Sequence, residues 1–155
     1  MHLDVRIQGD DFDVGVEQAA LLEATPEAGA VVAFTGCVRA RADDRDVLAL
    51  ELEHFPRMTE RSVEAVAREA AERWPLAGVT VIHRVGRLAA REQIVLVLTA
   101  SRHRQAAFDA ARFVMDYLKT RAVFWKREVY ADGSRWIESR SDDHAAAESW
   151  ARREG

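Results

Sequence analysis

Two periods of hydrophobic and polar residues run along this chain, one typical of strands and one typical of helices. Residues 47–53 alternate strictly, with leucine at every second position, and predict a half-buried strand. Residues 59–74 instead carry apolar side chains at helical spacing, with Thr59 able to cap the start and Pro75 ending the segment. The chain is therefore expected to contain both kinds of element.

The same patterns predict the other elements. Strands are expected at residues 2–8, 29–38, 79–85, 93–100, 124–130 and 135–138, and further helices at 14–24, 101 or 103 to about 120, and 142–152. Asp132-Gly133 predicts a hairpin turn. Strands in pairs interleaved with helices indicate an α+β fold. We expect a single domain, residues 1–155, with a mostly antiparallel sheet packed by helices and a small β-hairpin subregion.

Three connecting or buried segments have distinct expected environments. Residues 29–38 are apolar and β-branched, which predicts a buried strand. Residues 39–46 are charged and predict a mobile loop. Residues 88–92 are expected to be the turn that joins two successive strands.

Composition and charge exclude several classes of protein. The chain has 155 residues, a net charge of -4 and 31% charged residues, which argues against a basic nucleic-acid-binding face. Its longest apolar run, residues 94–100, is too short to span a bilayer, and no secretory signal opens the chain. The lone cysteine and five scattered histidines offer no spacing typical of a metal site. We expect a cytoplasmic protein with no metal, cofactor, nucleic acid or membrane.

The lysine content changes this picture. Among 22 basic residues, Lys119 and Lys126 are the only two lysines. Guanidinium stays protonated and is a poor nucleophile, whereas an amine can donate, accept or attack. These two lysines are either chance survivors on the surface or sites where arginine cannot serve.

The segment KTRAVFWKRE, residues 119–128, allows two interpretations. Lys119 would end the long helix, and in an extended strand Phe124, Lys126 and Glu128 share one face. Lys126 and Glu128 could form an ordinary ion pair of little energetic value. Alternatively, both amines meet in one pocket, where mutual repulsion would lower the pKa of one of them. Spacing alone leaves both interpretations open.

Two further segments carry candidate chemistry. Ser-Arg-His-Arg at residues 101–104 combines a helix start with cationic donors, so it indicates an anion site; alternatively it only solvates the helix start. Residues 35–39 (TGCVR) end a strand, where Arg39 would project toward a ligand. Cys37 has no identifiable base beside it, and a lone cysteine there is usually packing.

Together these segments resemble the molybdopterin synthase large-subunit family. The matching stretches cover nearly the whole chain in order: GAVVAFTGCVR (29–39), LELEHFPRMTE (50–60), RWPLAGVTVIHRVGRL (73–88), ASRHRQAAFDAARFVMDYLKTRAVFWKRE (100–128) and RWIESR (135–140). The blocks HxxMTE, IHRxG and DYLKT…FWK are the most specific. Val123 departs from the proline usual in the family, and residues 89–92 replace a turn that commonly carries Gly-Asp.

This resemblance implies a fold, a reaction and partners. The fold would be α/β hammerhead-like. The reaction would transfer two sulfur atoms to cyclic pyranopterin monophosphate, precursor Z, giving the dithiolene molybdopterin. Sulfur would arrive as a thiocarboxylate on the C-terminal glycine of a small ubiquitin-like subunit, and two large subunits would form the homodimeric core of a heterotetramer.

The resemblance also implies roles for individual residues. Lys119 would act as general acid/base and electrophilic stabiliser beside the thiocarboxylate, and Lys126 would bind substrate and assist proton transfer. The other substrate-binding residues would be Cys37, Val38, Arg39, His103, Arg104, Arg127 and Glu128. Arg140, and likewise His103 and Arg104, would reach a neighbouring subunit's site.

Two rival functions fit the same residues. A non-catalytic adaptor could dock a ubiquitin-like protein through a sheet edge and basic pocket, and would tolerate arginine at both lysine positions. A simple phosphate- or pterin-binding protein would bind its ligand without any protein partner.

Overall fold

The structure, a computed structural model, describes residues 1–122, 124–137 and 141–152. The helices are α1 (Val14–Ala24), α2 (Met58–Arg73), α3 (Arg104–Leu118) and α4 (Ser141–Arg152). The strands are β1 (His2–Gln8), β2 (Ala30–Cys37), β3 (Arg41–Ala42), β4 (Arg45–Asp46), β5 (Ala49–His54), β6 (Leu76–Arg84), β7 (Gly86–Ala89), β8 (Gln93–Ser101), β9 (Phe124–Tyr130) and β10 (Gly133–Ile137). These elements confirm the predicted α+β class.

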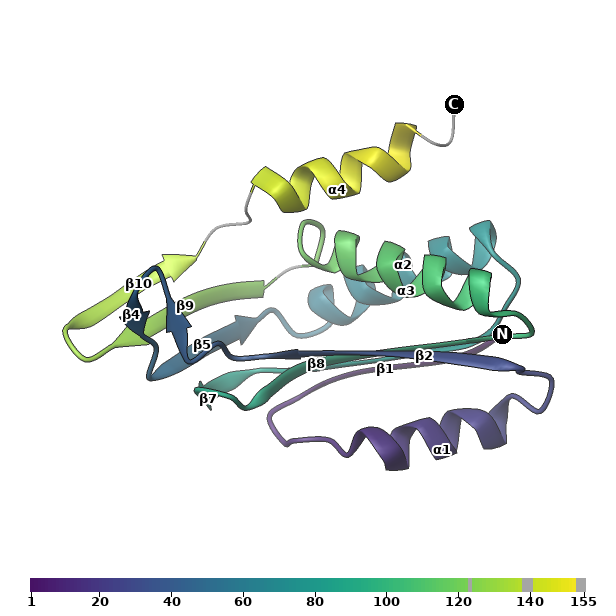
Figure 1. Ribbon diagram of the computed structural model, residues 1–155, viewed down its shortest axis with the longest axis horizontal. Coiled ribbons are helices and arrows are strands. Elements are labelled where there is room, and N and C mark those ends of the chain that lie inside the picture. The colour runs from purple at the N-terminus through teal and green to yellow at the C-terminus, as the bar shows by residue number, and fades with distance from the viewer. Residues whose placement is uncertain (123, 138–140, 153–155) are drawn as a thin grey trace.

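The first of two four-stranded sheets has the order β1-β6-β8-β2 and is covered on both faces (Figure 1). All its pairs are antiparallel except β1 with β6, which run parallel. Helix α1 covers one face, and α2 and α3 cover the other. Valines and alanines of α2 and α3, together with Phe113, bury the inner stripe of both helices against this sheet.

Trp150 docks the last helix, α4, onto this layer. Its ring packs edge-on against Trp74 and Phe113, and its indole N–H donates to an Asp116 carboxylate oxygen at 2.6 Å. In the described part of the chain, every helix is too short or too polar to cross a membrane.

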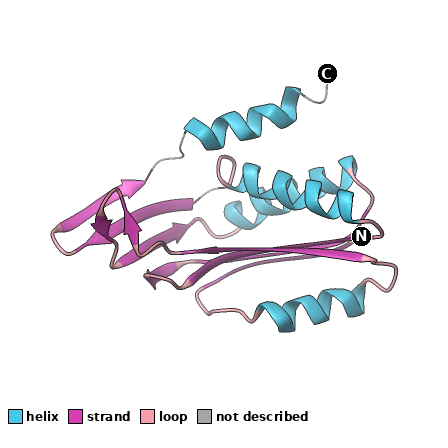
Figure 2. Ribbon diagram, in the orientation of Figure 1, coloured by secondary structure: helices cyan, strands magenta, loops and turns pink. Residues whose placement is uncertain are grey.

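The second sheet has the order β10-β9-β5-β7 and extends the molecule beyond one end of the first (Figure 2). Strand β7 was missed by the sequence patterns, which predicted a turn at residues 88–92. At Gly86 the backbone adopts a φ of +94°, which glycine tolerates, and the chain leaves the first sheet. It then pairs with β5 over residues 86–89 before returning as β8.

Two environments differ from those that the sequence indicated. Strand β2 is an edge strand and not a buried one: its residues are half-buried or exposed, and Phe34 is 40% exposed. Residues 39–46 contain the short hairpin β3–β4 in place of a mobile loop. Asp43 and Asp44 take the positive φ angles that a tight hairpin turn requires.

Ion pairs tie this hairpin to the turn between β9 and β10. Arg135 donates to Asp43 at 3.1 Å, and Arg45 donates to Asp132 at 2.5 Å. Arg45 also lies over the ring of Tyr130. The β3–β4 and β9–β10 hairpins therefore support each other at the far end of the second sheet.

The two sheets also meet through aromatic rings. His83, in β6 of the first sheet, stacks on Phe124, the first residue of β9, with ring centroids 3.8 Å apart and planes 21° apart. His83 is only 5% exposed, and its Nδ1 lies 2.8 Å from the backbone carbonyl of Arg84. A carbonyl only accepts, so Nδ1 carries the proton in this tautomer. Burial, followed by the charge of Lys126, lowers the pKa of His83 to about 3, which keeps the ring neutral.

Acid should therefore destabilise the fold through His83. Below the ordinary histidine pKa of 6.5, the unfolded chain takes up a proton that the folded chain refuses, so stability is full at higher pH and falls as pH drops toward 3. Between pH 7.5 and pH 5 this loss is about 2 kcal/mol. In urea unfolding at pH 7.5 and pH 5, the free energy of unfolding should fall by about 2 kcal/mol more in the native protein than in His83→Phe. An equal loss in both proteins would contradict the assignment.

Candidate active site

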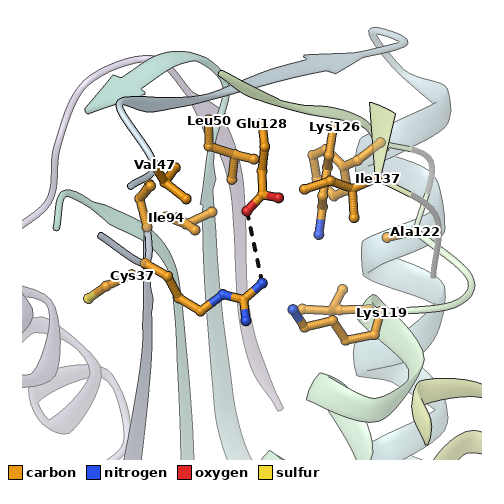
Figure 3. Close-up of a pocket in the computed structure, with 13 residues that line it drawn as sticks. Cys37, Val47, Leu50, Ile94, Lys119, Ala122, Lys126, Glu128 and Ile137 are labelled. Carbon is orange, nitrogen blue, oxygen red and sulfur yellow. Dashed lines mark ion pairs between the residues drawn. The ribbon is translucent and has the colours of Figure 1, made fainter. Parts of the chain in front are cut away.

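A cavity of about 390 Å³ opens where the end of β2, the end of α3 and strands β5 and β9 converge (Figure 3). Its lining residues are Cys37, Val38, Arg39, Val47, Leu50, Ile94, Leu118, Lys119, Ala122, Phe124, Lys126, Glu128 and Ile137. Most of these residues are apolar, and four of them, Arg39, Lys119, Lys126 and Glu128, carry charged side chains. Such a combination is typical of small-molecule sites, in which a few polar groups orient a ligand.

Both lysines reach this cavity from different elements. Lys119 is the residue that caps the C-terminal end of α3, and its backbone N–H donates to the carbonyl of Met115 at 3.2 Å. Lys126 lies on β9, in register with Leu52 of β5 and Ile137 of β10. Figure 3 shows both side chains directed into the same space. The structure thus shows the arrangement in which the helix end and the strand bring two amines to one pocket.

Glu128 supplies a buried carboxylate on the same face of β9 as Lys126. It is 4% exposed and accepts hydrogen bonds from the Tyr130 hydroxyl at 2.7 Å and from Arg135 at 3.3 Å. The bond to Glu128 raises the pKa of Tyr130, so the hydroxyl stays a donor. These partners compensate the cost of burying the carboxylate.

Arg39 faces this carboxylate across the cavity. Its guanidinium lies 3.9 Å from a Glu128 oxygen (dashed line in Figure 3), while its side chain is 64% exposed. Among the described residues, the cavity therefore holds three cationic side chains, those of Arg39, Lys119 and Lys126, and one carboxylate, that of Glu128. That imbalance favours an anionic ligand, for example a phosphate ester or a carboxylate-like group.

Six of the sequence-predicted residues meet at this cavity. Besides the four ionisable ones, Cys37 and Val38 line it. Val38 is buried, and its backbone N–H donates to the carbonyl of Glu92, which anchors the strand end that carries Arg39. The Cys37 side chain is exposed, and its thiol points away from the amines in Figure 3.

Three predicted residues lie elsewhere within this protomer. Arg127 was expected to line the pocket, but successive residues of a strand face opposite sides. It pairs instead with Glu51 on the other face of the sheet, beside Trp136. His103 and Arg104 stand at the opposite end of α3, in a separate hollow with Phe108 and Asp109. A helix rises about 1.5 Å per residue, so residues 103 and 119 lie about 24 Å apart.

Two residues singled out from the sequence, Val123 and Arg140, lie outside the described residues. Other contributors were missed. Tyr130 shares the alternating face of Phe124, Lys126 and Glu128, and that period could have identified it as the partner of the carboxylate. Ile94 and His83 come from strands of the first sheet, and no local pattern connects them with residues 119–128.

Comparisons with known proteins agree with this geometry. Residues 7–121 match the family described as MoaE protein. The chain is 54% identical to the molybdopterin synthase catalytic subunit of Mesorhizobium japonicum, over 94% of this chain and 92% of that protein. It is 53% identical to the protein of the same name from Pseudomonas aeruginosa, over 94% of this chain and 97% of that protein.

A solved structure shares the fold. The molybdopterin biosynthesis MoaE protein from Burkholderia ambifaria superposes with a TM-score of 0.83 at 49% identity, over 97% of this chain and 99% of that one. The family match over residues 7–121 includes the end of β2, strand β5 and the end of α3, whereas β9 follows it and is covered by the longer match to this solved structure. This chain belongs to the MoaE family.

Proposed function

We propose that this chain uses its cation-rich cavity to transfer sulfur from a protein thiocarboxylate to a cyclic pyranopterin monophosphate, precursor Z. Family membership makes it a sulfurtransferase of molybdenum cofactor biosynthesis, the catalytic subunit of a molybdopterin synthase. The single observation that carries the proposed mechanism is the convergence of Lys119 and Lys126 on one cavity.

The cavity suits both reactants of such a transfer. A thiocarboxylate and a phosphate are anions, and Arg39 at the exposed rim can hold either one. Sulfur attack on the pterin side chain needs a proton donor for the departing oxygen and a group that holds the acyl carbonyl. An ammonium can do both. Lys119 is assigned to the thiocarboxylate and Lys126 to the pterin. Glu128 would hold the Arg39 guanidinium beside them through their ion pair.

The sulfur donor in this proposal is a small ubiquitin-like subunit with a thiocarboxylated C-terminal glycine. The two relatives are each a catalytic subunit, a name that implies an enzyme with at least one other subunit, which supports a partner of this kind. An extended glycine tail is also narrow enough for a cavity of about 390 Å³. We place the complex in the cytoplasm.

A second copy of this chain completes the proposed assembly. His103 and Arg104 line a hollow about 24 Å from Lys119 of the same chain, too far to touch a ligand held beside that lysine. The edge strand β2, with Phe34 40% exposed, and the 61% exposed Phe108 on α3 offer an apolar surface for a two-fold partner. In such a homodimer His103 and Arg104 would serve the neighbour's cavity, and two small subunits would make a heterotetramer.

Replacing either cavity lysine by arginine should strongly reduce turnover. Arginine keeps the charge but not a transferable proton or a compact ammonium. With thiocarboxylated small subunit and precursor Z, Lys119→Arg should lower kcat at least about 100-fold and Lys126→Arg at least about 10-fold. Product is measured as the dithiolene.

Arg112→Lys provides the matched control, because its side chain lies on the exposed face of α3 and is 69% exposed. It should retain native turnover. If Lys119→Arg also kept full turnover, the catalytic assignment would be wrong and the adaptor function would be favoured. Ligand binding without any partner dependence would favour the simple pterin-binding protein.

Subunit mixing tests the shared site. Lys119→Ala and His103→Ala should each be inactive alone. In a mixed homodimer one cavity regains both groups, so a refolded equimolar mixture should recover about one quarter of native activity. No recovery, with mixed dimers verified by mass spectrometry, would contradict the shared site, and native activity of His103→Ala alone would show that His103 has no role in turnover.

A further inference from the structure

His83 is a buried ring directly behind the cavity and lines no part of it. It is the second-to-last residue of β6 and pairs with Ile7 of β1 and Val95 of β8, so three strands of the first sheet hold its backbone. The hydrogen bond from Nδ1 to the Arg84 carbonyl fixes the orientation of the ring. The ring is therefore a rigid feature of the first sheet.

One face of the His83 ring packs against Phe124 at the start of β9. Phe124 stacks on it at 3.8 Å and is itself part of the cavity wall. Lys126 follows two residues later, on the same side of the strand. A shift of Phe124 would therefore move Lys126 relative to Lys119, which is held by a different element.

The charges around His83 explain why the ring has to stay neutral. Lys126 of β9, Lys119 at the end of α3 and His54 at the end of β5 all lower the pKa of His83 electrostatically. Arg84 offers only its backbone carbonyl, because its guanidinium donates to the carbonyls of Gly9 and Gln93. A protonated imidazole would add a buried cation to the positive charges of the two lysines.

We propose that His83 is a positioning residue for the lysine pair: its flat, uncharged ring sets the position of Phe124, and hence of Lys126, at the cavity. The kinetic consequence rests on the proposed sulfur transfer, whereas the structural consequence does not. The requirement is for a ring without charge, and the imidazole nitrogens serve only to orient it.

Two neutral substitutions separate the ring from its hydrogen bond. His83→Phe keeps a flat ring under Phe124 and loses the donor to the Arg84 carbonyl. His83→Gln keeps a donor and loses the ring. His2→Gln, an exposed histidine at the far end of β1, is the matched control.

The first readout is independent of catalysis. Because the chain has only two lysines, a spectrum of protein labelled with ¹³C at lysine Cε contains two signals, assignable with Lys→Arg variants. Both should stay near their native positions in His83→Phe and in the control, and the Lys126 signal should move in His83→Gln. Native signals in His83→Gln, or a displaced Lys126 signal in His83→Phe, would overturn the proposal.

The second readout is kinetic. His83→Phe should keep kcat within about 3-fold of native, and His83→Gln should lose about 10-fold or more in kcat with little change in KM for the small subunit, since small misplacements of catalytic groups are costly. Equal kcat values in His83→Phe and His83→Gln would show that His83 only packs in the core and does not position Lys126. If even the native protein transfers no sulfur, the proposed function fails, while the lysine spectra still decide the positioning role.

If His83→Gln does not fold, the native protein still provides a test. The ¹⁵N signals of the His83 ring should show one fixed neutral tautomer between pH 5 and pH 8. Protonation within that range would overturn the proposal, because the ring would then carry charge under working conditions.

Discussion

The stack of His83 on Phe124 is the contact on which the rest of the site depends, because it joins two sheets that are otherwise separate hydrogen-bonded units. The first sheet is rigid and covered by helices on both faces, and the second extends from its end. The cavity lies at this junction, so its geometry is only as well defined as the junction itself. Three different elements contribute the cationic side chains: Arg39 follows the end of β2, Lys119 lies at the end of α3, and Lys126 lies on β9.

Electrostatic asymmetry is the second constraint. Three cations share the cavity with one carboxylate, and that carboxylate is already engaged by Tyr130 and Arg135. A buried carboxylate without partners would destabilise the fold. Tyr130 and Arg135 hold the Glu128 carboxylate in one position beside the cationic side chains. The remaining positive charge is available to an anionic ligand. Neutral His83 behind the wall preserves this balance.

Local patterns in the sequence were sufficient for most elements. The helix at residues 14–24 and the strand at 124–130 were predicted with the bounds that the structure shows, because Thr25-Pro26 ends the helix and side chains alternate between the two faces of the strand. Strand β7 was missed, since a four-residue strand that begins at a positive-φ glycine shows no period. Strand β2 is as apolar as a central strand, yet it lies at an edge. An apolar composition indicates that a strand is buried but not which chain buries it. In the proposed dimer, a second chain would bury β2.

In the candidate site, too, local patterns place some residues and contacts between distant segments place the others. The proximity of Lys119 and Lys126 was one of two interpretations that their spacing allowed, because a helix end and the next strand often lie together. Arg127 follows Lys126 in sequence yet pairs with Glu51 on the other face, as strand alternation requires. His83 and Ile94 come from other strands, and only the sheet register brings them near the lysines. Contacts between sheets carry no local signal.

The central claim is that both lysines act on one bound reactant pair, and amine labelling tests it most directly. The chain has two lysines and one α-amine, so modification by a small acylating reagent can be followed by mass spectrometry at each amine. With the thiocarboxylated small subunit and the pyranopterin together, Lys119 and Lys126 should both be protected, while labelling of the α-amine of Met1 stays unchanged. Equal labelling of both lysines with and without the reactants would contradict the account.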